Sequence, residues 1–248
     1  MNRRTFLKAV PGFAVLAGTA STRSAGTSTL SSFAQDTGTT SSPTQDLQLI
    51  TLLKPEMDGG KSVLAALKER RTIRNISSEK LPPQVLSNLL WAAFGVNREK
   101  GPSAGGSGRT AASASNSQEI DLYVAMPEGV YLYEAGGHRL TPVAAGDFRG
   151  RSNRRGSGAK APVHIFYVVD IAKYAKAPFQ EPGLKDPEIQ KSYYYVATGL
   201  ISANVYLFAA SQGLAAHFHN CDRQNTANEF KLRSEQRVLF AQTVGYPA

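Results

Sequence analysis

Four residues within one short stretch carry the clearest chemical pattern in the chain. Arg70, Arg71 and Arg74 surround Thr72 in the sequence ERRTIRN. Guanidinium groups this close repel one another unless a negative group lies among them. The planar fork of arginine binds phosphate oxygens in pairs, and the threonine hydroxyl adds a further donor. The residue types and their spacing indicate an anion site of phosphate character, and a solvated basic surface is the alternative interpretation.

A second group of polar residues stands just ahead of an apolar stretch, in the sequence GRTAASASNSQEIDLYV. Ser113, Asn116 and Gln118 are interspersed there with alanine and serine. Small side chains let the backbone approach a flat ligand, and side-chain amides offer a donor and an acceptor together. We interpret these three residues as candidate binding residues, with Arg109 as a weaker candidate.

The elements that must position these residues follow from apolar periodicity and turn residues. Helical spacing predicts helices over 61–70, 82–96 and 192–214, the last of them buried and closed by Gly213. Apolar runs predict strands over 119–126 and 162–170 and in the stretches AAHFHN and QRVLFAQTVGY, with a hairpin over 129–143 that turns at Gly136–Gly137. Helices and strands mix without strict alternation, which predicts an α+β fold with a central mixed or antiparallel sheet.

Composition restricts the class of protein. The chain has 248 residues, 42% of them hydrophobic, which suits one domain with a substantial core. The net charge is +9, but four basic residues and no acidic ones lie in the first 34 positions. Without them 24 basic residues face 19 acidic ones, a balance of +5, so nucleic-acid binding is not favoured. The lone Cys221 excludes an intramolecular disulfide.

The N-terminal segment is typical of an export signal. Arg3 and Arg4 precede Phe6-Leu7-Lys8, and a short apolar run follows. This pattern resembles the bacterial twin-arginine (Tat) signal, so we expect a periplasmic or otherwise exported protein. We predict a signal over residues 1–34, a linker and arm over 35–60, and a folded domain over 61–248. Because the Tat route carries folded proteins, the signal also suggests a cofactor acquired before export.

The order of the motifs resembles the nitroreductase family of flavoproteins across residues 61–248. Its members carry Arg-Arg-(Ser/Thr)-x-Arg after the first helix, then a Pro-Ser-Ala-x-Asn-like stretch. A helix of the form Gly-x-x-x-x-Asn follows, with an Ala-x-x-x-Gly-Leu turn. GLISANVYLFAASQGL and the terminal QTVGYP are similar to these last features. The stretch GVYLYEAGGHRL resembles the branch near the thiazole- and oxazole-forming (SagB-type) dehydrogenases.

The resemblance implies FMN and a homodimer with flavins at its interface. It implies that the phosphate and ribityl chain are contacted by Arg70, Arg71, Thr72 and Arg74. It implies that the ring or ribityl side is lined, from either subunit, by Ser113, Asn116 and Gln118. It also implies that the backbone of Gly213 and Leu214 passes the ring edge, with Arg109 again a weaker candidate.

The activity implied is oxidation or reduction of a small conjugated substrate of nitro, quinone or azoline type. Flavin chemistry needs no protein nucleophile, so we expect no separate catalytic residue. The electron donor stays open between NAD(P)H and a non-nicotinamide donor, because export removes the protein from the nicotinamide pool. Ala112 stands where the family usually has proline, and basic residues common after the last strand are absent. A flavin carrier without turnover and an anion-binding module without flavin are therefore alternatives.

Other candidate features have simpler interpretations. His217, His219 and Cys221 alternate in sequence, but without a fourth ligand we predict no metal site. The basic loop over 149–160 is interpreted as solvated, with a lid for an anionic substrate as the alternative. We expect Trp91 to serve as an anchor of the core or of a dimer interface.

Overall fold

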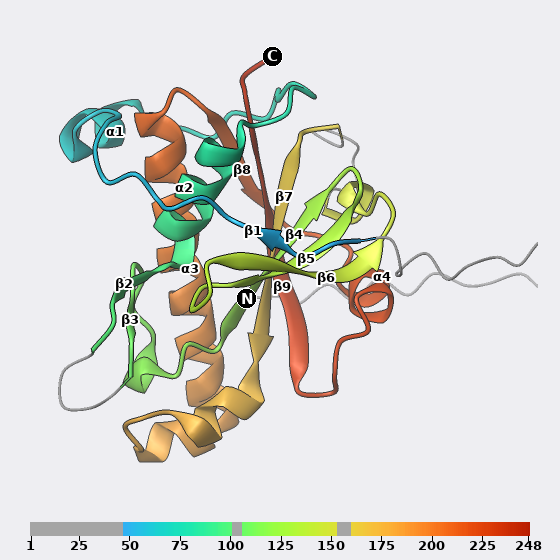
Figure 1. The fold of residues 1–248 in the computed structure, drawn as a ribbon. Helices are drawn as coiled ribbons and strands as arrows, with labels where there is room; N and C mark the ends of the chain where they lie inside the picture. Colours follow the sequence, from blue (N-terminus) through green and yellow to red (C-terminus); the bar gives the residue numbers. More distant parts are fainter. Residues whose placement is uncertain (1–46, 101–105, 153–159) are drawn as a thin grey trace, which may run out of the picture. The chain divides into compact units, whose positions relative to one another are not determined.

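The computed structural model describes residues 47–100, 106–152 and 160–248 (Figure 1). The export signal predicted over 1–34 lies outside these ranges, as do the first part of the arm and the centres of the loops at 97–109 and 149–160. All described residues belong to one unit, Ser41–Ala248. Among them, no helix is both long and apolar enough to cross a bilayer.

A seven-stranded sheet forms the centre of this unit, with the strand order β1-β6-β5-β4-β7-β9-β8. Its strands are β1 (Ile50–Thr51), β4 (Ile120–Met126), β5 (Gly129–Glu134), β6 (Arg139–Ala145), β7 (Val163–Asp170), β8 (Ala215–His219) and β9 (Gln236–Gly245). Each pair of neighbouring strands is antiparallel. The sequence predicted either a mixed or an antiparallel sheet, and the sheet is of the antiparallel type. The predicted arm contributes β1, which pairs with β6.

The helices are α1 (Val63–Glu69), α2 (Pro83–Phe94), α3 (Pro187–Ser211) and α4 (Arg223–Glu229), with short 3₁₀ turns η3 (Ala114–Asn116), η4 (Arg149–Ser152), η5 (Ile171–Lys176) and η6 (Pro182–Lys185). The helix predicted from residue 192 begins earlier because Asp186 caps it. The Asp186 carboxylate accepts hydrogen bonds from the N–H groups of Glu188 and Ile189, and Pro187 occupies the first turn. Apolar periodicity does not register this polar first turn.

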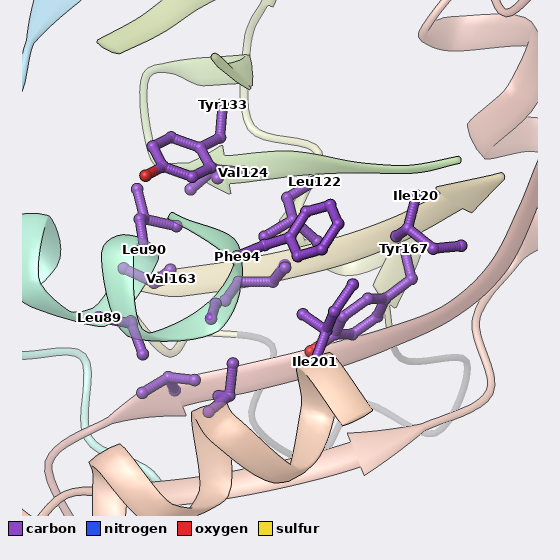
Figure 2. Packing of buried hydrophobic residues seen from close by; sticks show 14 of the residues in the cluster. Leu89, Leu90, Phe94, Ile120, Leu122, Val124, Tyr133, Val163, Tyr167 and Ile201 are labelled. Atoms are coloured by element: carbon purple, nitrogen blue, oxygen red, sulfur yellow. The ribbon is translucent and has the colours of Figure 1, made fainter. Parts of the chain in front are cut away.

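Two apolar clusters lie on the two faces of the sheet. Leu89 and Leu90 of α2 and Ile201 of α3 pack with alternate residues of β4 and β7, such as Leu122 and Tyr167 (Figure 2). The intervening residues of the same strands pack with Phe230, which follows α4. All eight residues of β7 are therefore buried, as expected of a central strand.

Several elements were not predicted from the sequence. No strand was predicted in the glycine-rich stretch 97–109, but its ends contribute to the pair β2 (Val96–Arg98) and β3 (Gly108–Arg109). Helix α4 was also missed, because its sequence RQNTANE carries almost no apolar periodicity. The Asp222 side chain accepts from the Asn225 N–H and so caps this helix instead.

Candidate functional site

The first group of site residues lies along the free edge of β8. Helix α1 ends at Glu69, and the chain then runs extended beside the sheet, where the Ile73 N–H donates to the Ala216 carbonyl at 3.0 Å. This pairing sets the segment 70–74 against both β8 and the C-terminal half of α3. The Cζ atom of Arg70 lies 5.4 Å from the ring centroid of Tyr206 on α3, a cation–π contact.

The three arginines of this segment (Arg70, Arg71 and Arg74, hereafter the arginine cluster) have no carboxylate partner within the described ranges. Of the other arginines, Arg139 pairs with Glu134 and Arg151 with Glu229. Others in the described ranges, such as Arg98 and Arg223, also lack a carboxylate partner, so it is the closeness of three such groups that distinguishes the cluster. Unneutralised positive charge next to a hydroxyl group is the donor set that a phosphate dianion requires. The residues present therefore fit the phosphate end of FMN.

The end of α3 brings the predicted glycine–leucine turn to the same place. Gly213 has φ +70°, and the Leu214 N–H donates to the Ala209 carbonyl at 2.8 Å, which is a Schellman termination. A Cβ atom on Gly213 would meet nothing within 4 Å, so it is the left-handed conformation that favours glycine here. Leu214 and Arg71 line one small hollow together with Tyr206. The fold thus joins the arginine cluster to Leu214.

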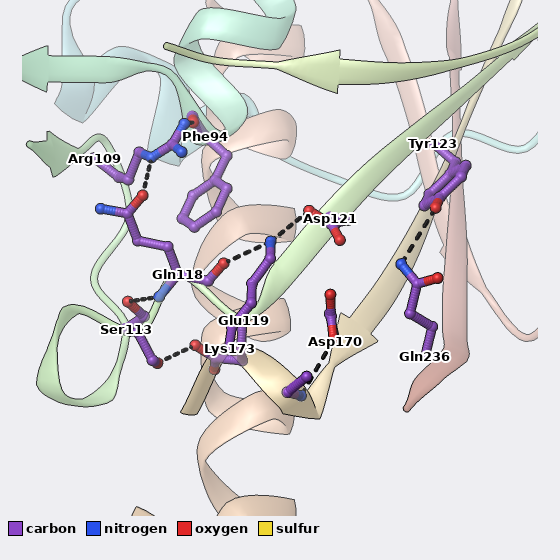
Figure 3. A network of polar contacts seen from close by, with 12 residues as sticks. Phe94, Arg109, Ser113, Gln118, Glu119, Asp121, Tyr123, Asp170, Lys173 and Gln236 are labelled. Carbon is purple, nitrogen blue, oxygen red and sulfur yellow. Dashed lines mark hydrogen bonds and ion pairs between the residues drawn. The ribbon is translucent and has the colours of Figure 1, made fainter. Parts of the chain in front are cut away.

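The second group forms a hydrogen-bonded loop between β3 and β4 (Figure 3). Arg109 Nε donates to Gln118 Oε1 at 2.7 Å, and Gln118 Nε2 donates to the Ser107 carbonyl at 2.8 Å and to Asn116 Oδ1 at 3.1 Å. The Gln118 N–H donates to Ser113 Oγ at 3.0 Å. The Gln118 amide is therefore used within the loop, and its role here is to shape the loop.

The backbone of this loop is unusual. Ser115, Asn116 and Gln118 have φ values of 51°, 54° and 49°, in the left-handed region that residues other than glycine seldom occupy. Such conformations cost free energy and persist only where surrounding contacts impose them. Three of them in four positions mark this loop as a place where shape takes precedence over stability.

Arg109 is an anchor of the loop. Burial lowers the pKa of its guanidinium, which lies 5.1 Å from the ring centroid of Phe94 and donates to the Phe94 carbonyl at 3.1 Å. Behind the loop, Lys173 Nζ donates to the Gln118 carbonyl at 3.1 Å and pairs with Asp121 at 2.5 Å. Burial raises the pKa of Asp121, and the Lys173 charge opposes that rise. The loop is thus held from both sides.

A buried carboxylate lies next to this support. Glu119 is fully buried, and its Oε2 accepts from Ser117 Oγ at 2.6 Å. Its Oε1 has no hydrogen-bond partner among the described residues. Burial of the Tyr174 hydroxyl is the main cause of its raised pKa, and the nearby charge of Glu119 adds to that rise. The sequence analysis did not single out Glu119.

Two adjoining hollows lie between the β3–β4 loop and α3, and neither is lined by the arginine cluster or by Leu214. One, of about 380 Å³, is lined by Arg109, Ser113 and Asn116, and the other, of about 300 Å³, extends to Asn204 of α3. Thr110 borders both, and its carbonyl accepts from Asn204 Nδ2 at 3.2 Å. A third hollow, of about 290 Å³ between β1 and the start of α2, shares no lining residue with these.

Tyr206 is a residue of the site that the sequence analysis missed. Its hydroxyl lies 3.1 Å from Thr72 Oγ1 and accepts from the Phe218 N–H at 2.8 Å. Tyr206 thereby joins the arginine segment to α3 and β8. The sequence offers one indication of its role. Tyr206 stands two residues after Asn204, in the helix that resembles the family motif, and its hydroxyl is polar in an otherwise apolar stretch.

The structure bears on the remaining candidate features. His217 and His219 do share one face of β8, with ring centroids 4.6 Å apart, but Cys221 packs in the apolar cluster around Phe230. Across the described part of the chain, no group of three potential ligands could hold a metal ion. Within the basic loop, Arg149 pairs with Asp147, while residues 153–159 lie outside the described ranges.

Trp91 is partly buried and donates from Nε1 to the Val96 carbonyl at 3.0 Å. This bond ties α2 to the start of β2. The residue therefore anchors structure within the chain, and its place at a dimer interface stays a prediction.

Comparisons with known proteins bear on the family and the fold of the chain. The sequence profile of the Nitroreductase family matches residues 67–246. A "putative nitroreductase" of Ralstonia eutropha with a solved structure is 31% identical, with 81% of this chain and 90% of that chain covered and a TM-score of 0.71. A curated protein of Methanocaldococcus jannaschii, also named "Putative nitroreductase", is 25% identical over 72% of this chain and 88% of its own length.

More distant structures share the fold. The nitroreductase CinD of Lactococcus lactis, solved in complex with 4-nitrophenol, is 18% identical with a TM-score of 0.52, covering 75% of this chain and 89% of that chain. A chain of the Escherichia coli microcin synthetase McbBCD complex, with truncated pro-MccB17 bound, is also 18% identical, with a TM-score of 0.58 over 82% of this chain and 79% of that one. The protein belongs to the nitroreductase family and is an oxidoreductase of α+β fold.

Proposed function

We propose that the protein is an exported FMN-dependent oxidoreductase that acts on a small conjugated substrate. The observation that carries this proposal is the arginine cluster, three guanidinium groups without a carboxylate partner in the described structure, next to Thr72. All three arginines are exposed, so water screens part of their mutual repulsion, and a bound anion would offset the rest. The phosphate of FMN supplies that anion.

The chain's own residues would bind and orient the cofactor. The arginine cluster and Thr72 would hold the phosphate and the adjoining ribityl chain. Ser113 and Asn116 would contact the ring or ribityl side, while Arg109 and Gln118 fix the shape of that loop. Gly213 and Leu214 would pass the ring edge with backbone. Bound FMN would supply hydride and electron transfer, and the protein would orient the ring and exclude water from it.

The substrate class follows from the size and neighbours of the site. The hollow of about 380 Å³ beside Arg109 lies within the range of small-molecule pockets. We propose that it accepts a flat nitro, quinone or azoline compound, a class that the 4-nitrophenol complex of CinD supports by analogy of fold. A flavin carrier without turnover is the second candidate, favoured by Ala112 at the family's proline position.

We propose further that the protein is a homodimer built on α3. Ile189, Val196 and Leu200 are 39%, 62% and 43% exposed and recur at spacings of seven and four, which places them on one helix face. Exposed apolar side chains also lie on neighbouring α1, namely Val63, Leu64 and Leu67. The family resemblance implies that the same surface of a second copy of the chain covers these side chains.

The proposal is tested by the colour and affinity of the protein. Purified from its native compartment, it should show flavin absorption between 300 and 550 nm. Replacing Arg70 or Arg74 with alanine should weaken FMN binding by roughly 10- to 100-fold, as expected for the loss of a charged hydrogen bond. Arg139→Ala, which removes an arginine already paired with Glu134, is the control and should bind FMN normally.

Anaerobic titration identifies the donor and separates the rival functions. Reduction by NADH or NADPH within seconds would identify a nicotinamide donor, and reduction by dithionite alone would favour another donor. Yellow protein without turnover on a nitroaromatic or quinone would favour the carrier. Colourless protein that takes up no FMN would overturn the proposal.

A further inference from the structure

The hydroxyl of Tyr206 occupies an unusual position at the free edge of the sheet. Strand β8 is an edge strand, and its Phe218 N–H has no strand partner on that side. Tyr206 supplies the missing acceptor at 2.8 Å and simultaneously lies 3.1 Å from Thr72 Oγ1. The same ring lies under the Arg70 guanidinium at 5.4 Å. One side chain thus contacts both the anion segment and the sheet.

The donor inventory fixes the direction of one of these two hydrogen bonds. A backbone N–H only donates, so the Tyr206 oxygen is the acceptor in its bond with Phe218. The phenol has a single proton left to donate, and the neighbour within reach is Thr72 Oγ1. Either hydroxyl can donate in the bond between Tyr206 and Thr72. In the arrangement in which Tyr206 donates, the Thr72 oxygen accepts and its own proton is left for another acceptor. Within the described residues Thr72 has no second side-chain hydrogen bond, so in this arrangement its proton is available to a bound phosphate.

We propose that Tyr206 is a positioning residue that fixes the Thr72 hydroxyl as a donor to the cofactor phosphate, so that the site prefers FMN over unphosphorylated riboflavin. This inference rests on the proposed function, since it takes the arginine cluster as the phosphate site. The arginines attract a negative group from any direction, because their charge acts over several ångströms. A hydroxyl donor of fixed direction acts only on an oxygen at one place, and so adds selectivity for a phosphate seated there.

The conservative variant isolates the hydroxyl. Tyr206→Phe keeps the ring under Arg70 and the apolar contacts of α3, but removes the acceptor of Phe218 N–H and the donor to Thr72. The freed Thr72 hydroxyl can then rotate or donate to other groups. We expect this variant to raise the Kd for FMN roughly 5- to 20-fold, the range expected when one charge-assisted hydrogen bond is weakened. Riboflavin lacks the phosphate, so its Kd should change less than about 2-fold.

The experiment measures Kd for FMN and for riboflavin by flavin fluorescence quenching on the folded chain. The variants are Tyr206→Phe, Thr72→Val, Thr72→Ser and the double variant Tyr206→Phe/Thr72→Val. Thr72→Val should reproduce the selective loss of FMN affinity, and Thr72→Ser, which keeps the hydroxyl, should restore it. Because Tyr206 acts through Thr72, the double variant should be no weaker than Thr72→Val alone.

Several outcomes would overturn the inference. Equal loss of FMN and riboflavin affinity in Tyr206→Phe would show a merely structural role for the hydroxyl, as would additive losses in the double variant. Unchanged FMN affinity would also refute it. In each of these cases a wild-type protein that binds FMN leaves the proposed function standing. A wild-type protein that binds neither flavin would overturn both.

Discussion

At the scale of single residues, some arginines of the chain form ion pairs with carboxylates and others do not. Arg149 and Arg151 are neutralised by Asp147 and Glu229, whereas the arginine cluster has no such partner in the described ranges. Histidines show the opposite treatment, because the fold keeps them neutral. His164 is fully buried between β4 and β9, its Nδ1 bonded to Ser152 Oγ and its Nε2 without a partner in the described structure.

The buried imidazole of His164 predicts a loss of stability in acid. Burial, followed by the charges of Arg149 and His219, lowers its pKa to about 3. The unfolded chain protonates this histidine near pH 6.5 while the folded chain does not, so stability falls as the pH drops from about 6.5 toward 3. We expect this residue alone to remove about 2 kcal/mol from the free energy of unfolding between pH 7 and pH 5.

Urea unfolding at pH 7 and pH 5 checks this expectation. His164→Gln keeps a polar partner for Ser152 but cannot be protonated, so its stability should change less with pH than that of the wild type. Equal pH dependence in the two proteins would contradict the assignment. His217, whose pKa is lowered to about 4, titrates in the same window and contributes to both proteins alike.

At the scale of elements, the β3–β4 loop and the end of α3 position the site by different means. The Schellman termination at Gly213 is a low-energy turn that glycine favours. The loop at 113–118 instead holds three left-handed residues through the side-chain amide and the backbone N–H of Gln118. A strained segment needs such support, so its shape should depend on one residue more than a relaxed turn does.

Gln118→Ala should therefore release the loop. The variant removes the acceptor of Arg109 Nε and both bonds donated by Nε2, so we expect an unfolding cost of about 1–3 kcal/mol and FMN binding weakened by roughly 10-fold or more. Ser115→Gly is the matched control, because glycine adopts φ 51° without strain and should preserve both properties. Thermal denaturation and FMN titration measure the two effects. Normal FMN affinity in Gln118→Ala would refute the role given to this side chain.

At the scale of the whole molecule, one proposal places a dimer interface at the exposed apolar face of α3, and another assigns export to the N-terminal arginines. Apolar side chains as exposed as Val196 and Leu200 are costly on a monomer when they form a continuous stripe. Both proposals concern properties beyond the single folded chain, and each has its own test.

Disrupting the α3 face should convert the proposed dimer to a monomer. Val196→Glu combined with Leu200→Glu would place like charges opposite one another across a two-fold interface, which disfavours association. Light scattering after size exclusion should show a mass near that of one chain, and FMN should be lost with the partner's contribution. Leu49→Glu is the control. Leu49 is 46% exposed and lies outside α3, so a charge there should leave the dimer intact. A wild-type monomer that retains FMN would contradict the proposal.

Export should depend on the arginine pair at the N-terminus. Replacing Arg3 and Arg4 with lysine keeps the charge but removes the twin-arginine pattern, so the protein should accumulate in the cytoplasm. Cell fractionation measures this, and Arg23→Lys serves as the control because that arginine lies outside the motif. Unchanged export of the lysine variant would exclude the Tat route.

Local pattern was enough to predict much of the fold. The apolar spacing of 82–96 and the glycine pair at 136–137 correspond to α2 and to the β5–β6 hairpin, because periodicity and turn preference are properties of neighbouring residues. Elements without an apolar pattern, such as α4 and the β2–β3 pair, were missed. Their formation depends on caps and pairing with distant segments, which periodicity does not register.

The sequence by itself determined the family, through the order of its motifs, and residue type and spacing predicted an anion site at the arginine cluster with Thr72. Only the tertiary structure decided how those residues are used. Thr72 and Tyr206 are 134 positions apart, and Gln118 turns its amide into its own loop toward Arg109. The physical reason is that charge and hydrogen-bonding capacity belong to each side chain, whereas the partner and direction of each bond depend on which distant segments pack together.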